Sequence, residues 1–201
     1  MPEVLVASNN PKKLAEMQRI LGERLPDVTV LGLGDVAPYD EPVEDAPHFA
    51  GNALLKARAG LAASGIPTVA DDSGLCVDAL NGMPGVLSAR WSGPPKSDAR
   101  NNDLLLAQLA DVPDERRGAF FACAVAFCRP DGAEAVVRGE MRGRVVREVR
   151  GSGGFGYDVL FEADDAPGVT TAELTPADKD AISHRGKALR EIGPLIAAAL
   201  T

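Results

Sequence analysis

Two adjacent acidic residues, Asp71 and Asp72, follow a short apolar run that begins at Thr68. Such a run predicts a strand, so we expect both carboxylates at the C-terminal end of that strand. Carboxylates in that position are suited to binding Mg²⁺ and activating a water molecule. The alternative is an Asp-Ser-Gly turn, completed by Ser73 and Gly74, that leaves both acids in solvent. The long patterned segment around the pair, ADDSGLCVDALNGMPGVLSARWSG, favours a functional role.

A polar turn lies near the N-terminus, in the segment Ser8-Asn9-Asn10-Pro11-Lys12-Lys13. Residues 4–7 predict a strand, and Pro11 suits the first position of a helix capped by Asn10. A strand that enters a capped helix leaves N–H groups and the positive end of the helix dipole facing an anion. Lys12 and Lys13 would lie in the first helical turn, where a cation is unfavourable until an anion binds. Taken alone, the segment is better explained as a plain cap with solvated lysines.

A glycine-rich segment, residues 151–158, has the sequence GSGGFGYD. It is neither a P-loop nor a GxGxxG fingerprint, because a strand rather than a helix is expected to follow at 159–161. The glycines would let the backbone approach a flat ligand, and Phe155 could stack on a base, worth about 1–3 kcal/mol. The alternative is a mobile glycine hairpin, which explains the glycines better than the aromatic residues.

The segment 179–187, KDAISHRGK, marks the start of the last predicted helix. If Ser183 caps that helix, His184 and Arg185 project from its first turn, and Arg185 could donate a forked pair of hydrogen bonds to a purine oxygen. The alternative is an ordinary cap with solvated charges. The four segments together supply a basic cluster, an acidic pair, an aromatic ring and a base-reading end, which is the inventory of a nucleoside triphosphate hydrolase.

The composition limits the class of protein and of metal. The chain of 201 residues predicts one large domain, residues 1–201, and its formal charge of −8 disfavours a nucleic-acid groove. No apolar run approaches the roughly 20 residues that cross a bilayer, and we expect no secretory signal. Cys76, Cys123 and Cys128 lack CxxC spacing, which favours reduced thiols in a cytoplasmic protein. With only two histidines, the expected metal is a hard ion held by carboxylates, Mg²⁺ or Mn²⁺.

The elements that position these segments alternate between strand and helix at first, and a hairpin follows. Strands are expected at 4–7, 28–31, 68–70, 119–128, 135–146 and 159–161. Helices are expected at 11–21, ended by Gly22, at 49–63, at 98–110, and from two starts at Pro176 and Ser183. Residues 32–47 and 81–95 predict loops. This order favours an α/β fold with a mixed sheet.

Five blocks in this order closely resemble the inosine/xanthosine triphosphate pyrophosphatase family: SNNPKK, FAGNALLKA, ADDSGLCVDALNGMPGVLSARWSG, GSGGFGYD and TAELTPADKDAISHRGKAL. The resemblance runs from Val4 to about Ala188. It implies a long mixed central sheet flanked by helices, with two lobes and a substrate cleft between them. It also implies a Mg²⁺-dependent homodimer that converts purine nucleoside triphosphates such as ITP, dITP and XTP to the monophosphate and pyrophosphate.

Residue by residue, the resemblance places the triphosphate on Ser8, Asn10 and Lys13, in the turn that also holds Asn9, Pro11 and Lys12. It makes Lys56, from the NALLKA block, a further phosphate candidate. It makes Asp72 the general base or a metal ligand, assisted by Asp71 and Glu44. It lines the nucleoside pocket with Ser73, Phe155, Gly156, Tyr157, Asp158, Lys179, His184 and Arg185. Two positions depart from the family pattern: Gly51 stands where glutamate is usual, which bears on metal coordination, and Val159 stands where proline is usual.

The expected mechanism follows from these assignments. A water held by Asp72 attacks the α-phosphorus, Mg²⁺ neutralises charge, and Lys13 stabilises the departing pyrophosphate. Hypoxanthine and xanthine carry a carbonyl at the six-position that Arg185 or a backbone N–H can bond, whereas adenine carries an amino donor. Two alternatives remain: a pyrophosphatase for other modified nucleotides, and a nucleotide sensor without catalysis.

Overall fold

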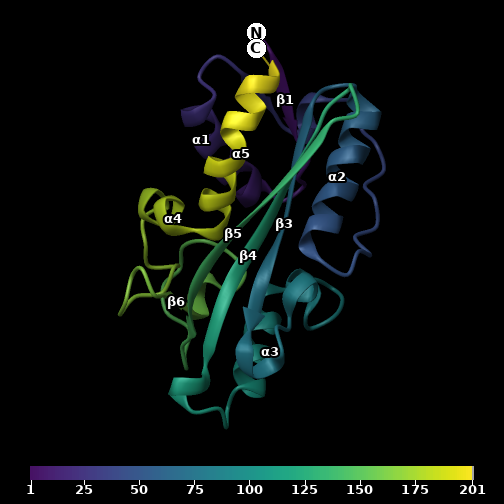
Figure 1. Cartoon of the computed structure of the whole chain (residues 1–201). Helices are drawn as coiled ribbons and strands as arrows, with labels where there is room; N and C mark the ends of the chain where they lie inside the picture. The colour runs from purple at the N-terminus through teal and green to yellow at the C-terminus, as the bar shows by residue number, and fades with distance from the viewer. Residues whose placement is uncertain (201) are drawn as a thin grey trace. The chain divides into compact units, whose positions relative to one another are not determined.

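The protein is described by a computed structural model that covers residues 1–200 (Figure 1). The chain forms two compact units. Unit 1 comprises Met1–Asp72, Cys123–Gly139 and the chain from Arg185 onward, and unit 2 comprises Ser73–Ala122 and Glu140–His184. No helix among residues 1–200 has the length and apolar character needed to cross a membrane.

Within residues 1–200, six strands form one mixed sheet in the order β2-β1-β3-β4-β5-β6. Their bounds are β1 (Glu3–Val6), β2 (Thr29–Leu31), β3 (Thr68–Val77), β4 (Gly118–Cys128), β5 (Glu134–Val145) and β6 (Phe161–Ala163). β1 pairs in parallel with both β2 and β3, whereas β5 and β6 are antiparallel, with Arg144 opposite Glu162. The mixed sheet predicted from the sequence is confirmed.

In the part of the chain that the structure describes, the α-helices that accompany the sheet are α1 (Pro11–Arg24), α2 (Phe49–Ser64), α3 (Asp98–Gln108), α4 (Pro176–Ile182) and α5 (His184–Leu200). The predicted start of the first helix is confirmed, because Asn10 caps it and Pro11 is its first residue. Gly65 ends α2 as predicted, with φ +70°, a conformation that glycine adopts without strain. The expected hairpin turn is also present, closed by a hydrogen bond from the Arg129 N–H to the Ala133 carbonyl at 3.0 Å.

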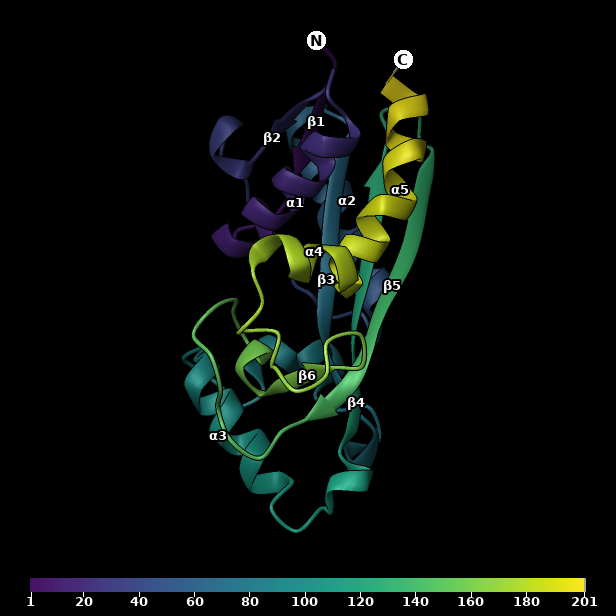
Figure 2. The same ribbon diagram turned by 90° about the vertical axis from the view of Figure 1, so that its left-hand side faces the viewer.

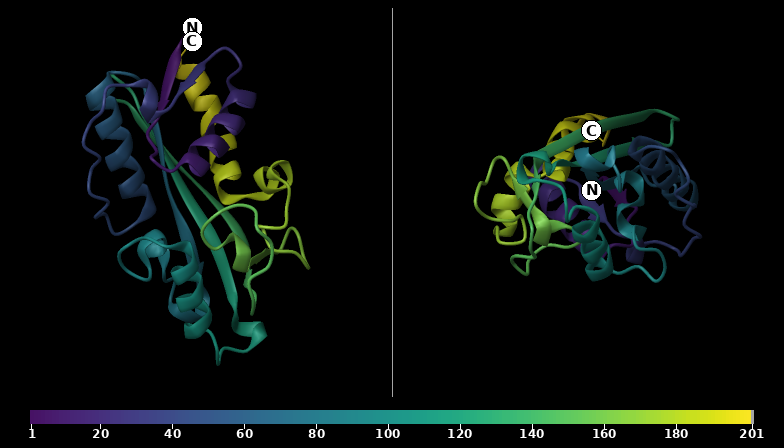
Figure 3. Two further views of the ribbon diagram at one scale, coloured as in Figure 1. Left: turned by 180° about the vertical axis from the view of Figure 1, so that it is seen from behind. Right: turned by 90° about the horizontal axis from the view of Figure 1, so that it is seen from below.

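In unit 1, alternate residues of the strands pack on opposite faces, as the two-residue period of a strand requires. One face packs against α1 and α5 (Figure 2), through Val4, Val6, Met17, Leu21, Val69, Cys123, Val125, Leu189 and Ile192. The other face packs against α2 (Figure 3), through Ala7, Ala53, Ala57, Ala70, Ala124 and Ala126. These small side chains let α2 lie close to the strands, and a Cβ on Gly60 of α2 would lie only 2.8 Å from the Thr68 side chain.

Unit 2 has its own apolar core, built on the remaining halves of β3, β4 and β5. It contains Leu75, Val77, Leu105, Leu109, Phe121, Met141, Val145, Leu160 and Phe161. The rings of Phe121 and Phe161 meet edge to face with 4.8 Å between centroids. Helix α3 supplies Leu105 to this core and Leu109 follows directly after the helix, both fully buried.

The prediction that β3 ends at the acidic pair is wrong. β3 continues from Thr68 to Val77, so Asp71 and Asp72 lie in the middle of a strand, not at its end. Gly74 is extended strand and not a turn residue: a Cβ there would lie 2.3 Å from the Gly85 carbonyl oxygen and 2.4 Å from Ser88 Oγ. The glycine is required because another part of unit 2 approaches the strand at this point.

The prediction that Gly22 ends the first helix is also wrong, since α1 continues to Arg24. A glycine inside a helix costs about 1 kcal/mol relative to alanine. That cost is outweighed by the complete burial of Leu21 and the near-complete burial of Leu25, whose N–H donates to the Leu21 carbonyl at 2.7 Å.

Candidate active site

The turn that enters α1 satisfies most of its own hydrogen bonds. The Asn10 Oδ1 accepts from the N–H groups of Lys12 at 3.0 Å and Lys13 at 3.2 Å, and the Asn10 N–H donates to Ser8 Oγ at 3.3 Å. Pro11 has no N–H to offer. The expectation of free backbone donors here is therefore corrected: this turn attracts an anion through its lysines and the helix dipole.

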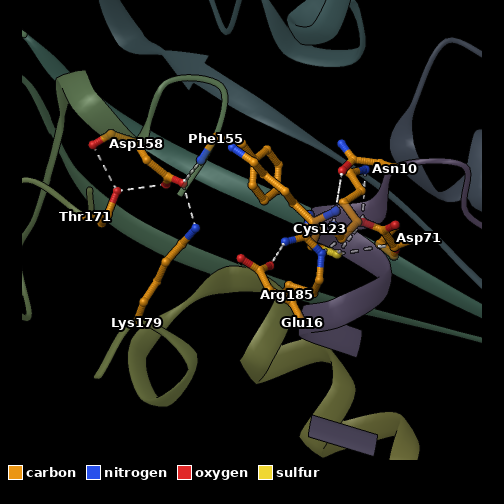
Figure 4. A network of polar contacts seen from close by, with 12 residues as sticks. Asn10, Glu16, Asp71, Cys123, Phe155, Asp158, Thr171, Lys179 and Arg185 are labelled. Carbon is orange, nitrogen blue, oxygen red and sulfur yellow. Dashed lines mark hydrogen bonds and ion pairs between the residues drawn. The ribbon is translucent and has the colours of Figure 1, made fainter. Parts of the chain in front are cut away.

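Asp71 is the centre of a buried ionic cluster in unit 1. Its Oδ2 lies 3.2 Å from Lys13 Nζ of α1 and 3.2 Å from Arg185 Nε of α5. Arg185 also donates through Nη1 to Glu16 of α1. Figure 4 shows the Asp71, Arg185 and Glu16 side chains converging from three elements. Asp71 and Arg185 are each 1% exposed, so neither meets solvent.

The cations around Asp71 determine its charge. Burial on its own would raise its pKa, but Lys13, Arg185 and Lys56 outweigh burial and hold the pKa well below the usual range of a carboxyl. Asp71 is therefore ionised at every physiological pH. Its Oδ1 is buried and accepts no hydrogen bond from any residue within 1–200. The neighbouring Cys123 thiol, 3.7 Å from Asp71 Oδ2, has its pKa raised by burial and by Asp71, so it stays protonated and is not a nucleophile.

Asp72 lies on the opposite face of β3 because adjacent side chains of a strand alternate. Its Oδ2 accepts a hydrogen bond from Asn52 Nδ2 of α2 at 2.9 Å, and its residue is 6% exposed. Burial raises the pKa of Asp72, although Lys56, Lys13 and the Asn52 hydrogen bond oppose the rise. The two neighbouring carboxyls thus have their pKa values moved in opposite directions, which is the pattern of a carboxyl pair with divided acid–base roles.

Lys56 of α2 and Glu44 of the preceding loop complete the unit 1 cluster. Their Nζ and Oε1 atoms lie 2.8 Å apart. Burial lowers the pKa of Lys56, but Asp71, Glu44 and Asp72 raise it further, so the ammonium form is favoured. In the part of the chain from 1 to 200, no three His, Cys, Asp or Glu side chains are grouped as a ready-made metal cage.

A second polar cluster lies in unit 2 and is centred on Asp158. The Asp158 Oδ2 accepts from Lys179 Nζ at 2.6 Å and from the Phe155 N–H at 2.8 Å, and its Oδ1 accepts from Thr171 Oγ1 at 2.9 Å (Figure 4). Lys179 Nζ also lies 5.0 Å from the centre of the Phe155 ring. A Cβ on Gly154 would lie 2.1 Å from Asp158 Oδ2, so glycine is required there. Asp158 therefore shapes the glycine-rich segment and orients its aromatic ring.

Helix α3 holds the same segment at Gly156. The Gly156 N–H donates to Asp98 Oδ2 at 2.7 Å, and Asn102 Nδ2 donates to the Gly156 carbonyl at 3.0 Å. Gly156 has φ +60°, which favours glycine. The next residue, Tyr157, is buried and its hydroxyl donates to the Ser88 carbonyl at 2.9 Å. The segment is thus an anchored loop rather than a mobile hairpin.

The relation of the chain to known proteins follows from a direct comparison. The family model described as the Ham1 family matches residues 4–194. The chain belongs to the Ham1 family. A relative from Nocardia farcinica, named dITP/XTP pyrophosphatase, is 62% identical over 98% of this chain and 96% of its own length. A relative of the same name from Mycolicibacterium paratuberculosis is 58% identical over the same shares.

Solved structures of Ham1-family relatives share the fold. The Ham1 protein of Staphylococcus aureus is 35% identical, with a TM-score of 0.86 over 98% of this chain and 99% of that one. A nucleoside-triphosphatase, dITP/XTP pyrophosphatase from Mycobacterium abscessus is 54% identical, with a TM-score of 0.76 over 94% of this chain and 98% of that one. The resemblance recognised in the sequence blocks is therefore confirmed.

The candidate residues of this Ham1-family chain fall into two sets. Unit 1 brings together Lys13, Glu44, Lys56, Asp71, Asp72 and Arg185. Unit 2 brings together Phe155, Asp158 and Lys179. Asn9, Pro11 and Lys12 are exposed in the entry turn, and Ser73 lies on β3. His184 is buried and stacks on the Phe121 ring, with 4.9 Å between centroids.

The sequence predicted that Arg185 projects toward a purine oxygen. In the structure its guanidinium donates to Asp71 and Glu16 and is 1% exposed, so it holds a carboxylate inside unit 1. The sequence alone did not show whether Arg185 contacts a ligand or a buried carboxylate, because a residue just after a helix start can project outward or turn back toward the core.

Several residues that complete the clusters were missed from the sequence. Glu16 lies three residues after Lys13 on α1, a spacing that puts both on one helix face. Asn52 is a buried polar residue within the NALLKA block. Asp98 and Asn102 are four residues apart on α3, again on one face. The spacing of these residues along their helices could have shown that they share a helix face. It could not have shown which residues that face contacts.

Proposed function

We propose that this Ham1-family chain hydrolyses non-canonical purine nucleoside triphosphates, ITP, dITP and XTP, to the monophosphate and pyrophosphate, and so cleanses the nucleotide pool. The relatives named dITP/XTP pyrophosphatase support the reaction. The observation that carries the proposal is the carboxyl pair on β3, whose pKa values move in opposite directions beside Lys13 and Lys56. Charged groups arranged in this way can bind a polyphosphate and activate a water molecule.

The unit 1 residues suit a hard divalent cation. Asp72 and Glu44 would hold Mg²⁺, with Mn²⁺ as a substitute. Mg²⁺ commonly takes only one or two protein carboxylates and completes its shell with phosphate oxygens and water. When bound, the ion neutralises phosphate charge.

The chain's own residues divide the remaining tasks. Asp72 accepts the proton of the attacking water, because its raised pKa and low exposure favour proton uptake, and Asn52 fixes the orientation of its carboxylate. Lys13 and Lys56 bind the phosphates, with Ser8 and Asn10 in the entry turn beside the first of them. Asp71 holds Lys13 and Arg185 in place. Each of these groups is positioned before substrate arrives, which is the main source of electrostatic catalysis.

The glycine-rich segment of unit 2 supports recognition of the purine. Phe155 stacks on the base, and Lys179, which Asp158 holds near that ring, supports the stack. A backbone N–H of this segment donates to the carbonyl at the six-position. We assign this contact to the backbone rather than to Arg185, whose guanidinium is engaged by Asp71 and Glu16. Adenine would leave that N–H without a partner, at a cost of about 1–3 kcal/mol.

A pyrophosphate-release assay with and without Mg²⁺ tests the proposed function. ITP, dITP and XTP should be cleaved faster than GTP and ATP, and only with the metal present. Cleavage of ATP faster than ITP would contradict the assigned base preference, and preferential cleavage of a modified pyrimidine triphosphate would favour the broader pyrophosphatase alternative. Binding of ITP without product under all metal conditions would favour a non-catalytic sensor.

We also propose that the working form is a cytoplasmic homodimer with no nucleic-acid partner. The net charge of −8 disfavours a polyanionic partner, and the three free cysteines, all buried, suit a reducing compartment. Sedimentation velocity at micromolar concentration tests the dimer: a single species with the mass of one chain would contradict it.

A further inference from the structure

A cavity of about 220 Å³ lies in unit 2, and its lining includes none of the residues of the two polar clusters described above. Its lining consists of Asp114, Arg117, Arg144, Val145, Val146, Arg147, Glu148, Arg150 and Glu162. The cavity follows the end of β5, where Arg144 lies opposite Glu162 of β6. Seven of the nine lining residues are ionisable, so the cavity is unsuited to an apolar ligand.

The net charge of the residues that line this cavity is positive, whereas that of the whole chain is negative. Four arginines face three carboxylates, an excess of one positive charge, in a protein whose formal charge is −8. Two of the three carboxylates are already engaged: Glu162 pairs with Arg144 at 2.9 Å and Arg150 at 3.1 Å, and Asp114 pairs with Arg147 at 2.6 Å. A cation at either of these two would have to displace an arginine, whereas an anion would not.

Arg117 carries the uncompensated charge. It is 2% exposed, and its guanidinium donates only to backbone carbonyls, of Leu109 at 2.6 Å, Val145 at 2.8 Å and Val146 at 3.0 Å. Within residues 1–200 no carboxylate forms an ion pair with it. Burial and the nearby Arg147 lower its pKa, and Asp114 opposes this without outweighing it. A guanidinium has five N–H groups, so two remain after these three bonds.

Arg150 provides a second unsatisfied donor. Its Nε is buried and has no hydrogen-bond partner among the residues that the structure describes, although Nη2 reaches Glu162 and Nη1 reaches the Gly168 carbonyl at 3.4 Å. A buried N–H without a partner is uncommon and costs about 1–3 kcal/mol. An oxyanion would satisfy such donors and compensate the excess charge together.

We propose that this cavity is a second binding site, specific for a small phosphate oxyanion, orthophosphate or pyrophosphate. The cavity is smaller than the roughly 300–1,000 Å³ of pockets for drug-sized ligands, which argues against a whole nucleotide. Arginine forks match phosphate oxygens in pairs, which makes phosphate the fitting oxyanion. The proposal does not rest on the proposed function.

Isothermal titration calorimetry of the full chain tests the proposal, with sodium pyrophosphate or orthophosphate in a chloride buffer that contains EDTA. The informative variant is Arg147→Gln, and its matched control is Arg58→Gln in unit 1. Arg147 and Arg58 are 52% and 54% exposed, and each pairs through Nε with a carboxylate, at 2.6 Å and 2.7 Å. Any phosphate bound by the unit 1 lysines is common to all three proteins, so the difference between them reports the cavity.

The native chain and the Arg58→Gln variant should bind the anion alike, while Arg147→Gln should bind it about tenfold or more weakly, the loss expected for one charge-assisted hydrogen bond. Preference for pyrophosphate over orthophosphate assigns the site to a diphosphate, and equal affinity assigns it to one phosphoryl group. Equal affinity in all three proteins, or no binding heat in the native chain, overturns the proposal. Should Arg147→Gln not fold, as judged by circular dichroism, Arg144→Gln replaces it, because Arg144 lines the same cavity and is 53% exposed.

Discussion

Lys13 Nζ lies 3.2 Å from Asp71 Oδ2, and this contact joins the first turn of α1 to the middle of β3. The same oxygen accepts from Arg185, so one buried carboxylate holds two cations from two helices. A buried charge that loses its partner is costly, because water cannot replace the partner. The carboxylate of Asp71 is therefore as much a part of the fold of unit 1 as of the proposed phosphate site.

We predict that Asp71→Asn destabilises the protein by about 3–5 kcal/mol, because it leaves Lys13 and the buried Arg185 without their shared counter-ion. Urea unfolding at pH 7 measures the change. The matched control is Asp131→Asn, which removes the exposed ion pair with Arg129 and should change stability by less than about 1 kcal/mol. A similar loss of unfolding free energy in both variants would show that the buried ion pairs of Asp71 stabilise the protein no more than an exposed ion pair does.

Asp72→Asn, in contrast to Asp71→Asn, should lose turnover and keep the stability of the native chain. The new carboxamide oxygen can still accept from Asn52, and neutralising a group whose pKa burial already raises costs little folding energy. The lost general base should lower kcat for ITP by about 10²–10⁴-fold. Initial-rate kinetics and urea unfolding on the same preparation test both halves. Turnover close to that of the native chain would remove Asp72 from the role of base.

The glycine at position 51 leads to a specific prediction about α2. The His48 Nδ1 caps this helix by accepting from the Gly51 N–H at 2.9 Å. A Cβ at position 51 would lie 2.6 Å from the Ala46 Cβ and 2.9 Å from His48 Cε1. Gly51→Ala should therefore destabilise the protein by about 1–3 kcal/mol through overpacking.

Gly22→Ala in α1 is the matched control for Gly51→Ala. Position 22 is also helical, but a Cβ there would meet nothing within 4 Å. Alanine should stabilise that helix by about 0.5–1 kcal/mol. Thermal unfolding of the two variants should move the midpoint in opposite directions. If both variants move it upward, His48 and Ala46 yield to the new side chain and the glycine is not required.

The sequence predicted the elements well and the contacts between them poorly. The cap of α1 was predictable because Asn10 and Pro11 act on their own neighbours. The continuation of β3 was not, since Gly74 looks like a turn residue until Gly85 and Ser88 are placed against it. The partner of Arg185 was beyond local reasoning, because Asp71 lies 114 residues away along the chain.

Local reasoning from the sequence also could not predict that Asp71 and Asp72 point to opposite faces of β3. A strand that ended at Asp72 would leave both carboxylates at one edge, whereas a continuous strand puts them on opposite faces. Only the second arrangement gives Asp71 the cations of α1 and α5 and gives Asp72 the amide of α2. The residue types indicated the chemistry, and the strand length determined which carboxyl does what.

Glu162 predicts a pH dependence of stability. Burial alone would raise its pKa, but a hydrogen bond from the Gly168 backbone and the guanidinium groups of Arg150 and Arg144 lower it. Because the folded pKa is below the unfolded value of about 4.3, the stabilisation is fully present above that value and is lost as the pH falls through the folded pKa. The native chain should therefore exceed Glu162→Gln in stability at pH 7, with the difference vanishing in strong acid.

Urea unfolding from pH 7 to pH 3 in chloride buffer checks this dependence. Glu140→Gln on the neighbouring strand β5 serves as the comparison for loss of one carboxyl. A difference between native chain and Glu162→Gln that stays constant with pH would show that hydrogen-bond geometry, and not the charge of Glu162, stabilises the region.

The hydrogen bond from the Gly156 N–H to Asp98 of α3 predicts that Asp98 is a positioning residue for the glycine-rich segment. Asp98→Ala removes the acceptor of the Gly156 N–H, so Phe155 loses its fixed place, and the KM for ITP should rise about tenfold with little change in kcat. Asp98→Asn keeps an acceptor oxygen and should restore the KM. Ser97→Ala breaks the cap of the same helix, at about 1 kcal/mol, without touching Gly156, and should leave the KM unchanged. If Ser97→Ala raises the KM as much as Asp98→Ala does, the rise comes from general loosening of α3. If Asp98→Asn does not restore the KM, the hydrogen bond between Asp98 and Gly156 is not the cause of the rise.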